Sequence, residues 1–210
     1  MDIWTLPGAD IKPLDDLMYR SDGLLNIVPS KRLFEFPHTT LQTWCVKRGV
    51  YQFPTEELIN WLYKQIAGRK AIEICAGNGV IGRALGIPIT DSYMQTIPEI
   101  KAYYESLKQT VIEPPPDVLK FTANDAVRHF KPDVVIGAWV TQLYQKGDTD
   151  GSVMGVDELE IIAHAKYIHI GNDRSHGYKL SMRKSHEHHY FDWLVSRGQD
   201  QSKNHLGVWG

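Results

Sequence analysis

Cysteine is scarce in this chain: Cys45 and Cys75 are the only two among 210 residues, and they lie in unrelated contexts. Two isolated thiols supply neither a disulfide framework nor the paired spacing of a structural zinc site, so we expect reduced thiols and a cytoplasmic location. Long apolar runs are lacking too, since no stretch approaches the roughly 18 residues of a membrane span. Residues 1–16 have neither a basic start nor an apolar run, so no signal peptide is expected.

A strong charge of one sign is also lacking. The chain has 23 Lys and Arg against 25 Asp and Glu, a formal net charge of −2. This balance argues against a protein whose whole surface binds nucleic acid, although a local basic patch is compatible with it. Hydrophobic residues at 42% and charged residues at 23% are typical of an ordinary globular protein, and the length corresponds to about one domain with a modest extension.

Two regions differ in pattern. Residues 1–53 contain several prolines and scattered aromatics without a long period, so we expect short helices and loops that form an N-terminal cap. Residues 54–210 are expected to form one α/β domain. Helices are predicted over 54–68, from the glycine turn to 85, and over 96–111, 124–130 and 156–165. Strands are predicted at 70–75, 87–90, 117–121, 133–139 and 166–171, with 179–184 and 205–210 as a terminal strand pair.

The alternation of strands and helices predicts a Rossmann-like, doubly wound, mostly parallel sheet with helices on both faces. Helix caps are expected at Thr55 and Asp157, at Asn124 or Asp125, and at a capping box of Thr96 and Glu99. Ligands of such sheets bind beyond the carboxyl ends of the strands, so the residues that follow each strand are the candidate site.

The stretch AIEICAGNGVIG, residues 71–82, contains a glycine-rich turn after a strand. Gly77, Gly79 and Gly82 spell G-x-G-x-x-G, the dinucleotide fingerprint. The acid that holds the ribose should lie about 20 residues further on, whereas Asp91 follows Gly77 by only 14 residues. In addition, Glu73 within the strand would repel a pyrophosphate, and it suits a ligand that bears hydroxyls or a positive charge.

This arrangement of an acid, small residues and glycines resembles motif I of the class I S-adenosylmethionine-dependent methyltransferases. The resemblance extends over roughly residues 48–172 and is greatest to compact bacterial and bacteriophage members. It implies a methyltransferase that uses S-adenosylmethionine and releases S-adenosylhomocysteine. Glu73, Ala76, Gly77, Asn78 and Gly79 fit the motif, and Cys75 stands where the family usually has its first glycine. The resemblance further implies Asp91 and Ser92 at the ribose, Asp125 and Ala126 at the adenine, and Tyr51 beside the methionine part.

A sulfonium is a fixed cation, so aromatic faces and carboxylates are favourable neighbours. Tyr51 and Trp139 supply such faces in the expected region. Each candidate also has a plain structural alternative: Glu73 could face solvent, Asp91 and Asp125 could cap helices, and Trp139 could fill the core.

The methyl acceptor is less defined. The segment GAWVTQ, residues 137–142, lacks the Pro-Pro turn of amino-directed DNA methyltransferases, and no Pro-Cys of cytosine C5 chemistry is present. Methylation of DNA bases is therefore disfavoured, and the acceptor stays open among small molecules, proteins and nucleic acids. We expect it between Trp139, the 141–155 loop and His176, with His176 as a base or substrate contact.

The C-terminal tail is rich in histidine and locally basic. The run SHEHHY, residues 185–190, matches no zinc spacing, and adjacent histidines on a strand point to opposite faces, so no metal is expected. Lys179 and Arg197 are among the basic residues of this tail. Two rival functions remain: a non-catalytic S-adenosylmethionine-binding sensor or inhibitory interaction protein, and an NAD-dependent oxidoreductase.

Overall fold

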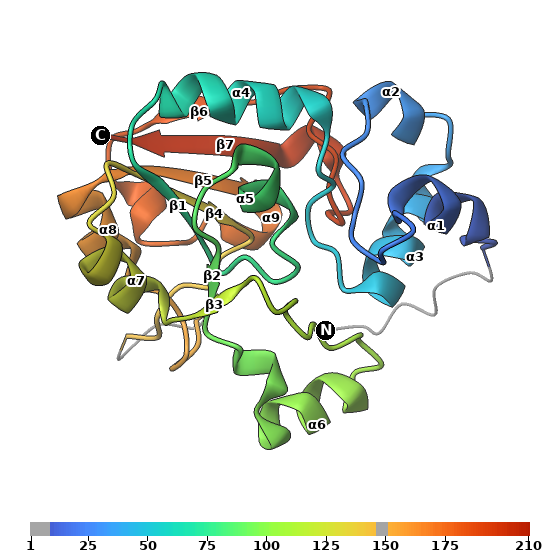
Figure 1. Cartoon of the computed structure of the whole chain (residues 1–210), viewed down its shortest axis with the longest axis horizontal. Coiled ribbons are helices and arrows are strands. Elements are labelled where there is room, and N and C mark those ends of the chain that lie inside the picture. Colours follow the sequence, from blue (N-terminus) through green and yellow to red (C-terminus); the bar gives the residue numbers. More distant parts are fainter. Residues whose placement is uncertain (1–8, 146–150) are drawn as a thin grey trace.

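The computed structural model describes residues 9–145 and 151–210, and a β-sheet lies at its centre (Figure 1). Five strands form one sheet in the order β1-β4-β5-β7-β6. They are β1 (Ala71–Ile74), β4 (Val134–Ala138), β5 (Lys166–Asn172), β7 (Asn204–Trp209) and β6 (Glu187–His189). β1, β4 and β5 run parallel, and β7 is antiparallel to both of its neighbours. The predicted α/β class with a mostly parallel sheet is confirmed.

A short parallel pair lies beside β1. β2 (Thr90–Asp91) pairs with β3 (Leu119–Lys120), and a single parallel bridge between Glu73 and Ile89 joins β1 to the segment that leads into β2. The spatial order β3-β2-β1-β4-β5 matches the first five strands of the doubly wound dinucleotide fold, but here antiparallel β7 lies next to β5. The order reverses between β1 and β4, and a ligand is expected beyond the carboxyl ends of those strands.

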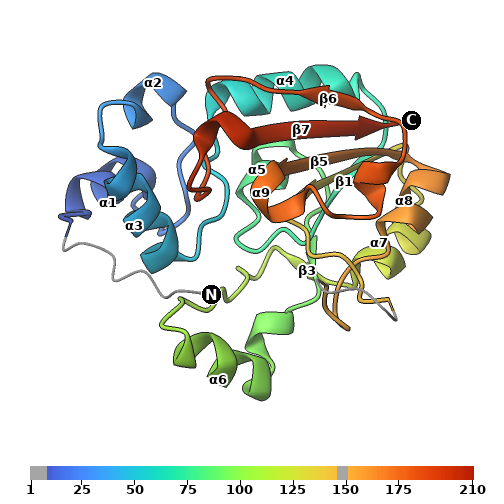
Figure 2. The same ribbon diagram turned by 180° about the vertical axis from the view of Figure 1, so that it is seen from behind.

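Helices cover both faces of the sheet (Figures 1 and 2). α4 (Glu56–Ile66) and α5 (Val80–Leu85) lie on one face, and α7 (Ala123–Phe130), α8 (Glu158–His164) and α9 (Asp173–His176) lie on the other. Successive side chains of β4 point to opposite faces of the sheet. Val134 and Ile136 therefore belong to the hydrophobic cluster on the α4 side, and Val135 belongs to the cluster on the α7 and α8 side. Among the described residues, no helix combines the length and apolar character needed to cross a membrane.

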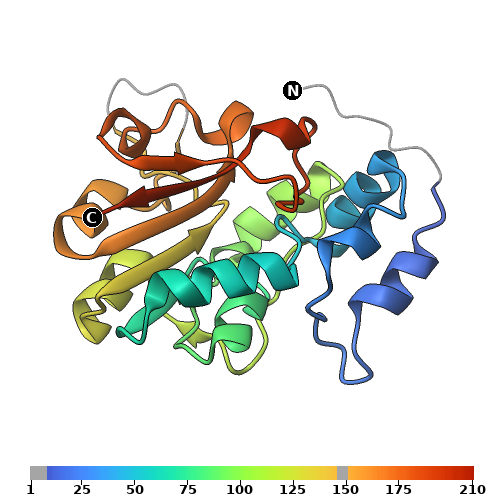
Figure 3. The same ribbon diagram turned by 90° about the horizontal axis from the view of Figure 1, so that it is seen from above.

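The N-terminal segment lies beside the sheet, toward the carboxyl ends of the parallel strands (Figure 3). It contains α1 (Lys12–Met18), α2 (Ser30–Leu33) and α3 (His38–Arg48). Trp44 of α3 is fully buried and stacks on Phe53 with ring centroids 5.3 Å apart. Its indole N–H donates to Asp15 Oδ1 at 2.8 Å. Residues of this segment and of the sheet belong to the same hydrophobic cluster, so they are packed as one unit.

Two of the predicted helix caps are confirmed and two are wrong. Thr55 accepts a hydrogen bond from the Leu58 N–H, and Asp157 accepts one from the Glu160 N–H. The capping box at 96–99 does not form, because α6 (Pro98–Ser106) begins after Ile97 without a side-chain cap and ends well before residue 111. Neither Asn124 nor Asp125 opens α7, which is capped one turn earlier by the hydroxyl of Thr122.

The predicted C-terminal strand pair is half correct. Residues 205–210 fall largely within β7, but residues 179–184 contain a short 3-10 helix instead of a strand. Lys179 and Ser181 turn inward there to contact the carboxylate of Glu158, which a strand pairing would not allow. The partner of β7 is instead the polar run Glu187–His189, which can form an edge strand because one face of an antiparallel pair can meet solvent.

Candidate functional site

Strained backbone marks the loops that follow β1, β2 and β4. Cys75, Tyr93 and Trp139 have φ angles of 51°, 61° and 55°, a left-handed conformation that residues with a side chain rarely adopt. Each lies within two residues of the end of its strand. Such strain is concentrated at binding and active sites. The strain and the reversal of strand order therefore indicate the same edge of the sheet.

Asp91, at the end of β2, is held by two backbone N–H groups. Gly77 donates to its Oδ2 at 2.9 Å, and Tyr93 donates to its Oδ1 at 2.8 Å. Gly77 can make this contact because its φ of 54° costs a glycine little. A carboxylate has about four lone-pair sites, so this one keeps acceptor capacity on both oxygens.

Glu73 lies in the interior, behind the glycine turn. Its side chain is 2% exposed, and its Oε2 accepts a hydrogen bond from the Gly82 N–H in the first turn of α5 at 2.7 Å. Burial raises the pKa of this carboxyl to about 8, against the opposing effect of the Gly82 hydrogen bond. A Cβ at Gly82 would lie 2.7 Å from the same oxygen, so the third glycine of the motif makes room for Glu73.

An open cleft lies at this edge and encloses about 750 Å³ of space that is continuous with solvent. Asp91 supplies the only carboxylate among the described lining residues, and no lysine or arginine is found among them. The lining residues are Tyr51, Cys75, Gly77, Asp91, Ser92, Met94, Gln95, Tyr104, Ile112, Pro114, Ala138, Trp139, Val140, Thr141, Met154 and Val156.

Trp139 and Tyr51 form one aromatic side of the cleft. Their ring centroids are 5.8 Å apart, and the guanidinium of Arg197 lies over the Tyr51 ring at 4.2 Å. The Trp139 backbone N–H donates to the Ile170 carbonyl at 2.8 Å, which anchors the loop after β4 to β5. Within the described residues, the buried indole N–H of Trp139 has no hydrogen-bond partner. A buried donor without a partner is costly, and it offers a contact for a ligand oxygen.

Three other residues of the predicted motif shape the turn and are not among the residues that line the cleft. The Ala76 N–H donates to the Thr90 carbonyl at 3.1 Å, and Asn78 Oδ1 accepts from the Val80 N–H at 3.1 Å. Gly79 has a φ of 69°, and a Cβ there would lie 2.9 Å from Ile89 Cγ2.

The two residues expected at the adenine are not among the residues that line the cleft. Asp125 is exposed, accepts the Thr122 hydroxyl at 2.6 Å and pairs with Arg128 at 2.9 Å. These two partners lower the pKa of the Asp125 carboxyl, the Thr122 hydroxyl more than the Arg128 charge. Ala126 is fully buried in the hydrophobic cluster on the α7 and α8 side.

His176 lies behind Trp139 and is not among the residues that line the cleft. Its imidazole is buried, its Nδ1 accepts the Asn172 N–H at 3.0 Å, and its ring meets the Trp139 ring edge-on at 5.1 Å. Burial, assisted by the positive charge of Lys179, lowers the pKa of His176 to about 3. The ring is therefore neutral at physiological pH and supports Trp139 from the interior.

Several lining residues were not predicted. Tyr104 of α6 lines the cleft, and burial raises the pKa of its phenol to about 12. Its neighbour Tyr103 is exposed. Ile112 and Pro114 come from the connection between α6 and β3. Thr141 and Met154 were named only as part of the 141–155 loop, which is expected to border the acceptor; residues 146–150 of this loop lie outside the described residues.

A buried ion pair lies beneath the loop after β4. Lys179 Nζ donates to Glu158 Oε1 at 2.7 Å and to the Val140 carbonyl at 2.8 Å, and both charged side chains are nearly inaccessible to solvent. The Tyr167 hydroxyl donates to the same Glu158 oxygen. Burial lowers the pKa of Lys179, and the Glu158 charge opposes that shift. The sequence does not distinguish Lys179 from the other basic residues of the tail, so its burial could not be predicted.

The histidine-rich tail also contains a group that weighs against the expectation of no metal. Asp173, His188 and His205 each offer one ligand atom, and these atoms all lie within 4.8 Å of one another. The sequence conceals the group because its members come from α9, β6 and β7.

Comparison with solved structures finds distant similarity. The chain is similar to the crystal structure of protein 1320 of Thermoplasma acidophilum, with a TM-score of 0.38 and 13% identity over 82% of this chain and 95% of that one. It is also similar to the PH0226 protein of Pyrococcus horikoshii OT3, with a TM-score of 0.26 and 17% identity over 73% of this chain and 74% of that one. No protein-family profile matches the sequence, and no curated protein matches it.

Proposed function

We propose that the chain binds S-adenosylmethionine in this cleft and transfers its methyl group to an acceptor. The observation that carries the proposal is the chemistry of the lining. One anchored carboxylate and several aromatic rings face the space, and no basic side chain is found among the described lining residues. A cation that bears vicinal hydroxyls suits such a cleft, because aromatic faces and carboxylates attract positive charge.

In this proposal, Asp91 accepts hydrogen bonds from the ribose hydroxyls. Both of its oxygens are already positioned by the Gly77 and Tyr93 N–H groups, so little ordering is needed when the ligand binds. Tyr51 and Trp139 lie beside the sulfonium, and the backbone of Cys75 and Gly77 borders the ligand. Glu73 acts indirectly, since it fixes the turn from behind.

Two features count against a dinucleotide as the ligand. A pyrophosphate would bind the free N–H groups at the start of α5, as in dinucleotide-binding folds. Here the Gly82 N–H already donates to Glu73, and the Gly77 N–H donates to Asp91. No lysine or arginine among the described lining residues would offset the phosphate charge.

S-adenosylmethionine supplies a methyl group that is already activated for displacement. The residues of this chain then have to align the acceptor and keep water out. A base is required only when the acceptor must lose a proton. Trp139 is the candidate for contact with the acceptor, through its ring face and its unpaired indole N–H. His176 holds that ring in place and is a positioning residue in this account.

The non-catalytic alternative has one specific observation in its favour. No histidine, lysine or glutamate is found among the described residues of the lining, so a general base is not evident. Transfer of a labelled methyl group from S-adenosylmethionine into a lysate fraction supports the enzyme. Binding of the cofactor without any transfer supports the sensor or inhibitor.

Asp91→Asn tests the ribose contact. We expect the variant to lose at least about tenfold in affinity for S-adenosylhomocysteine, since a hydrogen bond to a charged group contributes about 1.5–3 kcal/mol. Titration calorimetry measures the affinity, and thermal unfolding without ligand checks the fold. Asp192→Asn, at an exposed carboxylate, is the control and should bind like the wild type. Equal affinity in the Asp91 variant would overturn the assignment.

A further inference from the structure

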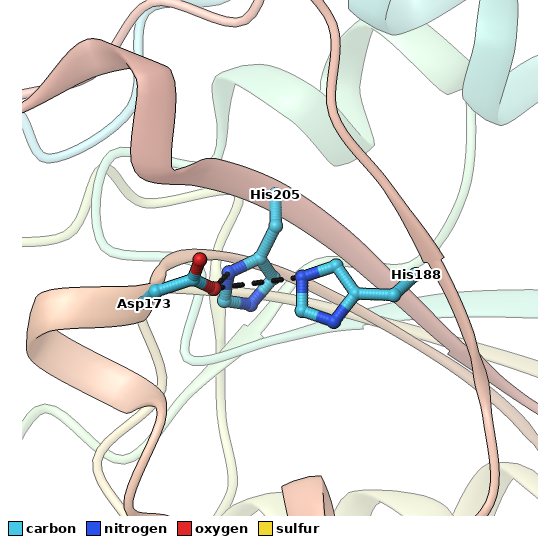
Figure 4. A group of neighbouring side chains, drawn as sticks. All are labelled: Asp173, His188 and His205. Carbon is cyan, nitrogen blue, oxygen red and sulfur yellow. Dashed lines mark ion pairs between the residues drawn. The ribbon is translucent and has the colours of Figure 1, made fainter.

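Asp173, His188 and His205 converge on one point at the far edge of the sheet (Figure 4). Asp173 begins α9 directly after β5, His188 is the central residue of β6, and His205 is the second residue of β7. His188 pairs with Gly207 in the β6–β7 register, and His205 lies two residues before Gly207. Side chains two apart along a strand share a face, so both imidazoles lie on the same side of the sheet.

The polar atoms of this group are close but poorly satisfied. His205 Nδ1 lies 2.7 Å from Asp173 Oδ1, and His188 Nε2 lies 3.5 Å from the same oxygen. The His205 side chain is completely buried, yet neither of its ring nitrogens has a partner in hydrogen-bond geometry within the described part of the chain. Buried imidazole nitrogens without a hydrogen bond need another partner, and a cation between these atoms would supply one.

His188 has a second imidazole on the side of its ring away from Asp173. His188 Nδ1 lies 3.2 Å from His186 Nε2, and His186 Nδ1 lies 2.7 Å from the Lys184 carbonyl oxygen. These contacts hold the His188 ring with its Nε2 toward Asp173.

The carboxylate of Asp173 is also held in place by a neighbouring side chain. The Tyr190 hydroxyl donates to Asp173 Oδ2 at 2.8 Å, which leaves Oδ1 directed at the two imidazoles. Hydrogen bonds of this kind, from neighbours that fix the direction of a ligand, are usual around protein metal ions.

We propose that Asp173 Oδ1, His188 Nε2 and His205 Nδ1 bind one divalent transition-metal ion. Two imidazoles with one carboxylate suit zinc and its neighbours in the first transition row, and they do not suit magnesium or calcium, which take oxygen ligands. Zinc bonds of about 2.0–2.1 Å place tetrahedral ligand atoms about 3.3 Å apart. The observed 2.7 and 3.5 Å lie on either side of that value.

The ion would join α9, β6 and β7. β6 has three residues and lies at the edge of the sheet, with β7 as its neighbour in the sheet. A bond from the ion to His188 would fix this short strand on the sheet. Asp173 and His188 keep 27% of their side-chain surface, so the ion can exchange with solvent. This metal site is separate from the cleft and is independent of the proposed methyl transfer.

Zinc titration of the chelator-treated full chain tests the proposal. We expect one zinc per chain by calorimetry, a higher thermal unfolding temperature with zinc, and no response to magnesium. Asp173→Asn and His188→Gln should each weaken zinc binding at least about tenfold. His189→Gln is the matched control, because this neighbour on β6 points to the opposite face. Both test positions are partly exposed, so the variants should fold.

Cobalt gives an independent measurement, since its visible absorption reports coordination by protein nitrogen and oxygen. The band should appear in the wild type and in His189→Gln and be absent from Asp173→Asn. Failure of the wild type to bind zinc would overturn the proposal. Equal zinc affinity in all three variants would do the same, because it would place the ion elsewhere.

Discussion

Glu73 is an acid whose protonation is coupled to folding. In the unfolded chain its pKa is that of an ordinary glutamate, about 4.3, whereas burial raises it to about 8 in the folded state. The folded protein therefore binds this proton more tightly. The resulting stability is fully present below about pH 4.3 and is lost as the pH rises through 8.

Glu73→Gln tests the ionisation of Glu73 while it keeps the hydrogen bond from the Gly82 N–H. Glutamine can still accept from the Gly82 N–H but cannot ionise. Between about pH 5 and 9, we expect the free energy of unfolding of the wild type to fall by a few kcal/mol relative to this variant. Denaturant unfolding at a series of pH values measures the difference. Glu99→Gln, exposed at the start of α6, should run parallel to the wild type. A constant difference between wild type and Glu73→Gln would contradict the raised pKa.

At the residue scale, the sequence predicts a site residue best where its position in an element determines where its side chain or backbone lies. The carboxyl ends of parallel strands are such positions. Cys75 and Trp139 directly follow strands, Asp91 ends β2, and Gly77 lies three residues beyond β1; all four line the cleft. Asp125 follows a strand too, but its direction depends on the rotation of α7, which Thr122 sets by capping that helix. The sequence places His176 shortly after β5, at the carboxyl ends of the parallel strands. No pattern in the sequence shows that its ring packs into the interior.

At the scale of elements, the pair of Lys179 and Glu158 joins three segments. Glu158 starts α8, Lys179 follows α9, and the Val140 carbonyl belongs to the loop after β4 that carries Trp139. Removal of one member leaves the other charge buried without its partner, which costs far more than the net contribution of the intact pair.

Lys179→Met should therefore lower the free energy of unfolding by about 3–5 kcal/mol. Denaturant unfolding monitored by tryptophan fluorescence measures the loss. Lys101→Met, which breaks the exposed pair with Glu113, should cost less than about 1 kcal/mol. A Lys179 variant as stable as the Lys101 variant would show that the buried pair contributes no more than a surface pair.

Elements with strong local signals were predictable, and those fixed by tertiary contacts were not. α4 has a capping threonine and a clear apolar face, so its position follows from sequence. α6 has no buried residue, and a helix without a buried face ends where its local contacts end, here at Ser106. β6 is polar and three residues long, and its pairing with β7 defines it as a strand.

At the scale of the whole molecule, the arrangement explains where the cleft lies. Parallel strands that reverse order between β1 and β4 leave a space beyond their carboxyl ends, and the N-terminal segment and α6 border it. The alternation of strands and helices predicts the sheet. Within α1 and α3 the buried residues keep a helical spacing, Leu14 with Met18 and Leu41 with Trp44 and Cys45. The sequence does not predict how these short helices pack, because the surface that they meet is formed by distant parts of the chain.

The most direct test of this account is calorimetric titration of the full chain with S-adenosylhomocysteine and, separately, with NAD. We expect saturable binding of S-adenosylhomocysteine with one site per chain and no heat from the dinucleotide. Binding of NAD without binding of S-adenosylhomocysteine, or the absence of heat from both, would contradict it.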